Sequence, residues 1–181
     1  FVSIHENPIS IRWFTPSIEV DLCGHATLAS ARILFECYPD LAGEEINFDS
    51  KSGNLKITRV DRGLCLNFPV DYPAEVESAP LFFEILGIKP LKLFRGKDDY
   101  LAIFKSQKQI EEMQPKFSLL KKVDARGLVI SAPGDDVDFV SRCFFPSTEV
   151  IEDPVTGSAH TSLIPYWSKR LNKTKLIAKQ L

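Results

Sequence analysis

The chain has 181 residues, which is enough for one large domain or two small ones. Hydrophobic residues make up 44% of it and charged residues 25%, with a formal net charge of -2; this is typical of a soluble globular protein and argues against nucleic acid or a membrane as a partner. Neither a secretory signal nor a long apolar run is visible, and four cysteines without C-x-x-C spacing favour reduced thiols in a cytoplasmic protein over a disulfide framework.

The first part of the chain predicts strands around one amphipathic helix. Residues 9–14 have the composition of a strand. Residues 24–38 predict a helix with an apolar stripe at helical spacing, formed by Leu28, Ala31, Leu34 and Phe35. Residues 43–69 predict strands joined by turns at Ser52-Gly53 and Arg62-Gly63.

The second part predicts a similar mixture. A helix over 79–87 ends at Gly87, and Pro165 falls inside the helix expected after Gly157, where it should kink or shorten that helix. Strands are expected at 91–96, 100–106, 126–134 and 138–146, and further helices at 106–115 and 117–125. The region rich in proline and polar residues near 69–80 predicts a division into a first half, 1–73, and a second half, 74–181.

The two halves contain a repeat. Residues 12–20 and 142–150 align without a gap, and Arg, Phe, Pro, Ser, Glu and Val coincide at six of the nine positions. Each copy then reaches a glycine, Gly24 or Gly157, followed by a helix. The shared order of strand, proline turn, acidic residue, glycine and helix predicts a duplicated unit whose equivalent loops meet in a shared cleft.

The helix starts suggest what the cleft binds. The first N–H groups of a helix have no internal partner, and the helix dipole adds positive character there. Such a site suits a carboxylate, or the oxyanion formed when a carbonyl compound loses an α-proton. The residues expected to contact the substrate through main-chain or hydroxyl groups are Gly24, Ala26, Thr156, Gly157 and Ser158.

His25 and Asp153 are the titratable groups predicted to handle protons at these loops. The alternatives are a structural histidine and a simple turn before Pro154. For Cys23 a buried packing thiol is favoured over a nucleophile. We expect the remaining polar and aromatic residues near the loops to serve structure: His160 as a structural or peripheral group, Glu152 as a solvated carboxylate, Glu19 and Glu149 as turn-fixing groups, and Trp13, Trp167 and Tyr166 as core or cleft wall.

The 181 residues lack the common sequence motifs for nucleotide binding, serine hydrolysis and zinc binding. They contain no P-loop, no G-x-G-x-x-G and no G-x-S-x-G. The three histidines, His5, His25 and His160, are dispersed, and no cysteine cluster or H-E-x-x-H suggests zinc. We therefore predict no metal site.

The segments "RWFTPSIEVDLCGHATLASA" and "IEDPVTGSAHTSL" resemble the two signature segments of the phenazine-biosynthesis-like (PhzF-like) family. The resemblance implies an α+β fold similar to that of diaminopimelate epimerase, with two pseudo-symmetric halves, each a mostly antiparallel sheet wrapped round a central helix. It also implies cofactor-independent isomerisation by proton transfer, as on trans-2,3-dihydro-3-hydroxyanthranilate, with His25 and Asp153 in the active site. We expect a small substrate that bears a carboxylate and can be cyclic. The candidate assembly is a homodimer.

The chain departs from the family pattern in two respects. The family's general acid/base is a glutamate in an N-x-S-E-T motif just upstream of a segment like "FVSIHENPISIRWFTP", and the 181 residues contain no such motif. The family's closing segment with Gly-Gly is also missing after Leu181, so we expect truncation at both ends. A non-catalytic ligand-binding or protein-interaction protein therefore stays an alternative. A thiol-based amino-acid epimerase is a second one, disfavoured because Thr156, not a cysteine, matches Cys23.

Overall fold

The computed structural model describes residues 1–15, 18–146 and 151–181. They form two compact units, Phe1–Pro69 and Val70–Leu181. The sequence-based boundary lay four residues later, after Pro73. Residues 70–73 belong to the second unit because the N–H of Asp71 donates to the carbonyl of Thr161, at 3.0 Å, and its carboxylate accepts from the N–H of Lys97, also at 3.0 Å.

The first unit is built on a five-stranded sheet with the order β1-β2-β5-β6-β7. Only β2 and β5 pair in parallel in this sheet as described, and the other neighbours are antiparallel. A separate hairpin is formed by β3 and β4. The strands are β1 (Val2–Ser3), β2 (Ile9–Ile11), β3 (Trp13–Phe14), β4 (Glu19–Val20), β5 (Glu45–Ser50), β6 (Gly53–Val60) and β7 (Gly63–Asn67).

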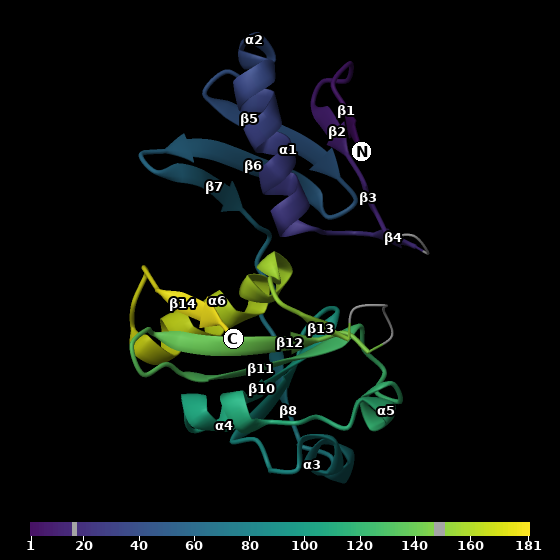
Figure 1. Ribbon diagram of the computed structural model, residues 1–181, viewed down its shortest axis with the longest axis vertical. Helices are drawn as coiled ribbons and strands as arrows, with labels where there is room; N and C mark the ends of the chain where they lie inside the picture. Colours follow the sequence, from purple (N-terminus) through teal and green to yellow (C-terminus); the bar gives the residue numbers. More distant parts are fainter. Residues whose placement is uncertain (16–17, 147–150) are drawn as a thin grey trace. The chain divides into compact units, whose positions relative to one another are not determined.

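Helix α1 (Gly24–Cys37) supplies the other layer of the first unit (Figure 1), followed by the short α2 (Pro39–Ala42). Its predicted apolar stripe is confirmed, because Ala31, Leu34 and Phe35 are buried and Leu28 is partly buried against the same core. The stripe packs on alternate residues of the central strands, Ile46, Phe48, Leu55 and Ile57. One core therefore holds α1 against the sheet.

The second unit has a seven-stranded sheet with the order β13-β12-β11-β10-β9-β8, and β14 also pairs with β12. The pairs β10·β11 and β12·β14 are parallel and the others are antiparallel. The strands are β8 (Ala74–Val76), β9 (Lys92–Arg95), β10 (Asp99–Ile103), β11 (Gly127–Pro133), β12 (Phe139–Phe144), β13 (Glu152–Asp153) and β14 (Ala178–Gln180). The helices are α3 (Pro80–Leu86), α4 (Gln107–Glu112), α5 (Phe117–Leu120), the 3-10 turn η1 (Gly157–Ala159) and α6 (His160–Leu171).

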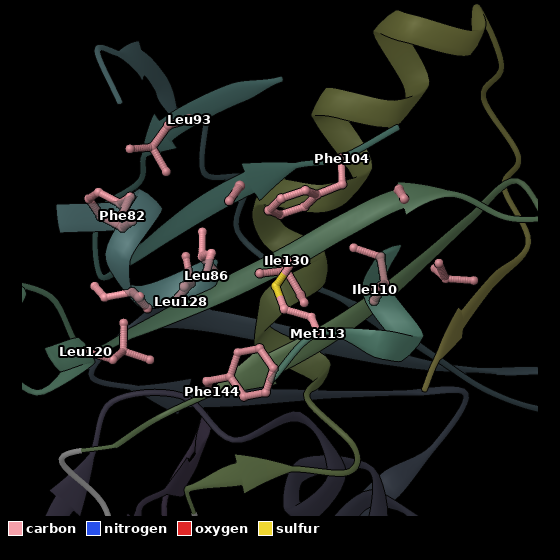
Figure 2. Close-up of a cluster of buried hydrophobic side chains, with 14 residues drawn as sticks. Phe82, Leu86, Leu93, Phe104, Ile110, Met113, Leu120, Leu128, Ile130 and Phe144 are labelled. Atoms are coloured by element: carbon pink, nitrogen blue, oxygen red, sulfur yellow. The ribbon is translucent and has the colours of Figure 1, made fainter. Parts of the chain in front are cut away.

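The sheet of the second unit is buried on both faces. One face packs against α3, α4 and α5 (Figure 2) through a cluster that includes Phe82, Ile110, Leu120, Ile130 and Phe144. The other face packs against α6 through a cluster that includes Phe139, Cys143, Leu163 and Trp167. Because strand side chains alternate between faces, neighbours on β12 belong to different cores.

The mixed α+β class is confirmed, and most of the predicted elements form close to their predicted positions. The strand expected over 9–14 is divided, because β2 pairs with β1 and β5 whereas β3 pairs with β4. The helix expected over 117–125 is only one turn long. Trp13 and Trp167 are buried, and Tyr166 is partly buried against Phe94 with ring centroids 5.2 Å apart.

Pro165 lies inside α6, as the sequence indicated, and the helix continues beyond it to Leu171. A proline has no N–H, so the carbonyl four residues earlier, that of Thr161, receives no helical hydrogen bond. In the structure this carbonyl accepts from the N–H of Asp71. The Thr161 carbonyl, which lacks a helical donor because of Pro165, therefore links the start of the second unit to α6 through its hydrogen bond with Asp71.

Candidate functional site

The first site segment is the hairpin that leads into α1. Arg12 binds Glu19 with two hydrogen bonds, Nε to Oε1 at 2.8 Å and Nη2 to Oε2 at 2.9 Å, and its guanidinium lies 5.0 Å from the ring centroid of Phe14. Lys51 also donates to Glu19, at 2.7 Å. The hydrogen bonds from Arg12 and then Lys51 lower the pKa of Glu19 to about 2. Glu19 thus links β4 to Arg12 and Lys51, and its expected role in fixing the turn stays a prediction because residues 16–17 of that turn lie outside the described residues.

The hairpin delivers the chain to the first residues of α1. Cys23, in an extended conformation, is the N-cap. Its carbonyl accepts both from the N–H of Thr27, at 3.1 Å, and from the Thr27 hydroxyl, at 2.7 Å. The N–H groups of residues 24–26 precede this first helical hydrogen bond, so the helix itself supplies no partner for them.

His25 is exposed at this helix start. Its Nε2 lies 3.5 Å and its Nδ1 3.9 Å from Cys23 Sγ. Cys23 is partly buried against the first-unit core, so it packs as predicted but also touches the histidine. The segment therefore presents an imidazole beside a row of helix N-terminal amides.

The second site segment repeats the anchor of the first. Arg142 binds Glu152 with two hydrogen bonds, Nε to Oε1 at 2.7 Å and Nη2 to Oε2 at 3.0 Å, and its guanidinium lies 5.1 Å from the Phe144 ring centroid. Its Nη1 also donates to the carbonyls of Ile110 and Met113, at 2.8 Å each. The prediction that Glu152 is simply solvated was wrong, because it is the partner of a largely buried arginine.

This geometry corrects the sequence alignment of the repeat. Glu19 pairs with Phe14 across β3 and β4, and Glu152 pairs with Phe144 across β12 and β13. The counterpart of Glu19 is therefore Glu152; Glu149, which the ungapped alignment had matched to it, lies outside the described residues. The connection is three residues longer in the second copy.

A spacing in the sequence could have revealed this correspondence. In both copies the anchoring glutamate precedes the helix glycine by five residues, Glu19 before Gly24 and Glu152 before Gly157. The ungapped alignment matched only the strand and the proline turn. It therefore missed the alignment of residues 19–24 with residues 152–157. In the corrected register Asp153 matches Val20, Thr156 matches Cys23 and Ser158 matches His25.

Asp153 is held by its own loop. The Thr156 hydroxyl donates to Asp153 Oδ2 at 2.8 Å, and the N–H of Val155 donates to Oδ1 at 3.2 Å. Thr156 is almost completely buried, so it acts as a support for Asp153 in the structure, in addition to the substrate contact expected from the sequence. Gly157, Ser158 and Ala159 follow as the turn η1 that opens α6.

His160 has the structural role that was predicted. Its Nδ1 lies 3.2 Å from the Thr156 carbonyl, which can only accept, and its ring faces Phe139 with centroids 6.3 Å apart. Thr27 makes the equivalent bond to Cys23 in the first copy. Both copies therefore close the helix start with a side chain that binds the carbonyl four residues earlier.

Cys143 lies beside Asp153, although the two are distant in sequence. It is completely buried, and this burial raises the pKa of its thiol to about 12. A thiol with that pKa stays protonated near neutral pH and is a poor base. The structure thus gives a physical reason against a mechanism with two thiols, although Cys143 is closer to the site than the sequence suggested.

Two further features bear on ligands. Within the described ranges, no group of three or more His, Cys, Asp or Glu side chains could hold a metal ion. The second unit has a cavity of about 970 Å³, and the residues that line it include Lys92, Phe94, Ile164, Tyr166 and Arg170. None of the predicted site residues lines this cavity.

Across the same described residues, no helix is long and apolar enough to cross a membrane.

A comparison with protein families identifies the fold and its lineage. The family described as Phenazine biosynthesis-like protein matches residues 2–180. The chain belongs to this family. The PhzF-like resemblance of the two signature segments is thereby confirmed, and with it the diaminopimelate epimerase-like fold.

Relatives of the phenazine-biosynthesis-like chain cover almost all of it. It is 49% identical over 170 residues to an uncharacterized isomerase of Pseudomonas aeruginosa, which covers 94% of the chain. It is 44% identical over 183 residues to an uncharacterized isomerase of Halalkalibacterium halodurans, which covers 99%. The chain spans 65% of the length of the first relative and 69% of the second.

Solved structures of the family agree with the fold. A PhzF family protein from Enterococcus faecalis superposes with a TM-score of 0.84 at 45% identity, over 94% of this chain and 65% of the other. A putative PhzC/PhzF protein from Clostridium difficile gives a TM-score of 0.83 at 40% identity, over 96% and 66%.

Proposed function

We propose that this phenazine-biosynthesis-like protein is a cofactor-independent isomerase that moves a proton on a small carboxylate-bearing metabolite, cyclic metabolites included. The observation that carries the proposal is the duplicated loop. Each copy is anchored by an Arg–Glu pair, ends at a helix start and bears a different titratable group, His25 in one and Asp153 in the other. Relatives that match almost the whole chain are named isomerases.

The two loops contribute different chemistry to one substrate. Helix N-terminal amides bind the substrate carboxylate and stabilise the negative charge that develops when a proton leaves. His25 and Asp153 orient substrate groups and relay protons. The residues assigned to substrate binding are Gly24, Ala26, Thr156, Gly157 and Ser158.

The family resemblance assigns abstraction of the proton to a glutamate in an N-x-S-E-T motif, which the 181 residues do not contain. Activity is therefore a property to be measured on the full-length protein. These two loops would bind the substrate and guide the proton, and the glutamate would remove and return it. A full-length sequence without such a glutamate would favour a ligand-binding protein that keeps the loops but has no turnover.

The test is Asp153→Asn in the full-length protein, with Asp136→Asn, an exposed aspartate outside the site, as the matched control. Turnover and incorporation of solvent deuterium are measured first on trans-2,3-dihydro-3-hydroxyanthranilate and then on other cyclic carboxylates. We expect the site variant to lose about 100-fold or more of its turnover with its thermal unfolding unchanged. Wild-type turnover in Asp153→Asn would remove this residue from the mechanism.

The thiol-based epimerase has its own discriminating experiment. The contact between Cys23 Sγ and His25 Nε2, at 3.5 Å, is the observation that favours this alternative. Cys23→Ser should retain turnover within about threefold if the carboxylate mechanism holds, because a serine preserves the size of the side chain. Loss of deuterium exchange in Cys23→Ser, with Asp153→Asn still active, would reverse the assignment.

A further inference from the structure

Gln180 on β14 binds the Asp153 loop with three hydrogen bonds, more than any other side chain in the described residues gives it. We propose that Gln180 is a positioning residue that fixes Asp153 and Thr156 for proton transfer. This inference rests on the proposed function, and it assigns a task to a residue that neither signature segment contains.

The sheet brings Gln180 to the loop. Strands β13 and β14 both pair with β12, with Asp153 opposite Cys143 and Gln180 opposite Ser141. Ser141 and Cys143 are two positions apart on one strand, so their partners lie on the same face of the sheet. A long amide side chain at position 180 can therefore reach along this face to the Asp153 loop.

The hydrogen bonds determine how the amide is oriented. Gln180 Oε1 accepts from the N–H of Thr156 at 2.8 Å, so the other end of the amide must be the donor. Its Nε2 donates to the Asp153 carbonyl at 2.5 Å and to Thr156 Oγ1 at 3.2 Å. Both ends of the amide are thus used, and a flipped amide would place a donor against an N–H.

The same bonds direct the hydroxyl hydrogen of Thr156. A hydroxyl that accepts from Gln180 Nε2 can still donate its single hydrogen, and it does so to Asp153 Oδ2 at 2.8 Å. Without Gln180 the hydroxyl keeps its acceptor on Asp153 but loses the donor that fixes the orientation of its lone pairs. Gln180 therefore sets both the main chain of the loop and the direction of the hydrogen bond that the carboxylate receives.

The first copy of the repeat is supported differently. There the turn between β5 and β6 holds the loop, with Lys51 on Glu19 and Ser52 Oγ donating to the Asp21 carbonyl at 2.8 Å. These contacts hold residues 19 and 21, which precede the helix start. They do not include His25, the titratable group proposed to act in this copy. The support from Gln180 is thus specific to the copy that bears the aspartate.

The test is Gln180→Met in the full-length protein, a change of similar size that removes all three polar contacts. Lys179→Met, at an exposed neighbour on the same strand, is the matched control. Because small displacements of reacting groups cost up to about 100-fold, we expect kcat to fall about 10- to 100-fold with KM changed less than threefold. Adding Gln180→Met to Asp153→Asn should cause no further loss, because the glutamine acts through the aspartate.

A second readout needs no substrate. Hydrogen–deuterium exchange at the amides of Val155 and Thr156 should accelerate at least tenfold in Gln180→Met and stay unchanged in Lys179→Met. This result would support the positioning role even if the isomerase proposal failed. Unchanged exchange, wild-type kcat in Gln180→Met, or an additive loss in the double variant would each overturn the inference.

Discussion

At the scale of single residues, the two copies keep the side chains that build the loop and differ in those proposed to act. The arginine, phenylalanine and glutamate recur with the same paired hydrogen bonds and the same cation–π contact, and the glycine recurs at the same spacing from the glutamate. Val20 in one copy stands where Asp153 stands in the other, and His25 stands where Ser158 does. Each copy therefore carries one titratable group of a different kind at the corresponding loop.

Thiol reactivity should follow burial. Cys37 and Cys65 are exposed, whereas Cys143 is completely buried with its pKa raised to about 12. We expect iodoacetamide at pH 8 to label the two exposed thiols within minutes and to leave Cys143 unlabelled until the protein is unfolded, because the thiolate is the nucleophile. Peptide mass spectrometry measures this directly. Rapid labelling of Cys143 in the native protein would contradict its assignment as an inert thiol.

The Glu19 carboxylate should make stability depend on acid pH. Its pKa is lowered from 4.5 to about 2 by the hydrogen bonds from Arg12 and Lys51. A carboxylate with a lowered pKa stabilises the folded state above its ordinary pKa, and that contribution is lost as the pH falls towards the folded value. We expect Glu19→Gln to melt only slightly below the wild type at pH 6, because the pair is exposed, with the difference disappearing between about pH 4.5 and 2. A constant difference across this range would contradict the ion-pair explanation.

At the scale of elements, an arginine at a strand end ties each site loop to its sheet, but the two arginines differ in burial. The Arg12 side chain is 56% exposed, and that of Arg142 is 12% exposed and also satisfies two main-chain carbonyls near α4. Buried charges and carbonyls that lose a partner are costly, whereas exposed pairs contribute little. The second loop is therefore the more firmly built of the two.

Arg142→Met should destabilise the protein by about 2–3 kcal/mol, because Glu152 and the carbonyls of Ile110 and Met113 lose their donor. Arg12→Met is the matched control and should cost clearly less. Arg142→Lys should recover only a fraction, since an ammonium group cannot reproduce the planar pair of bonds. Urea unfolding measures all three, and equal costs for Arg12→Met and Arg142→Met would contradict the difference in burial.

The element scale also shows how far the sequence could lead. Periodicity located α1 and its buried stripe, and glycines and prolines located most turns, because these signals are local. Pairing between distant strands is not local. The sequence thus missed that Cys143 lies beside Asp153, that Glu152 pairs with Arg142, and that Gln180 reaches the Asp153 loop.

At the scale of the whole molecule, each unit has its own core: the apolar cluster around α1 draws on the first unit, and the two clusters on either face of the larger sheet draw on the second. The repeat therefore lies on two separately packed supports, which hold the two loops by independent anchors. The sequence predicted this duplication from the Arg-x-Phe and glycine positions. The ungapped match did not give the register of the longer second loop, although the five-residue spacing from the glutamate to the helix glycine marks that register in both copies.

The central claim is that the helix starts at residues 24–26 and 157–158 bind one carboxylate substrate. A crystal of the full-length protein soaked with a small cyclic carboxylate such as anthranilate tests it most directly. We predict density for the ligand with its carboxylate against the backbone amides of these helix starts and with its ring near His25 and Asp153. A ligand bound instead in the 970 Å³ cavity of the second unit, with both helix starts unoccupied, would contradict the account.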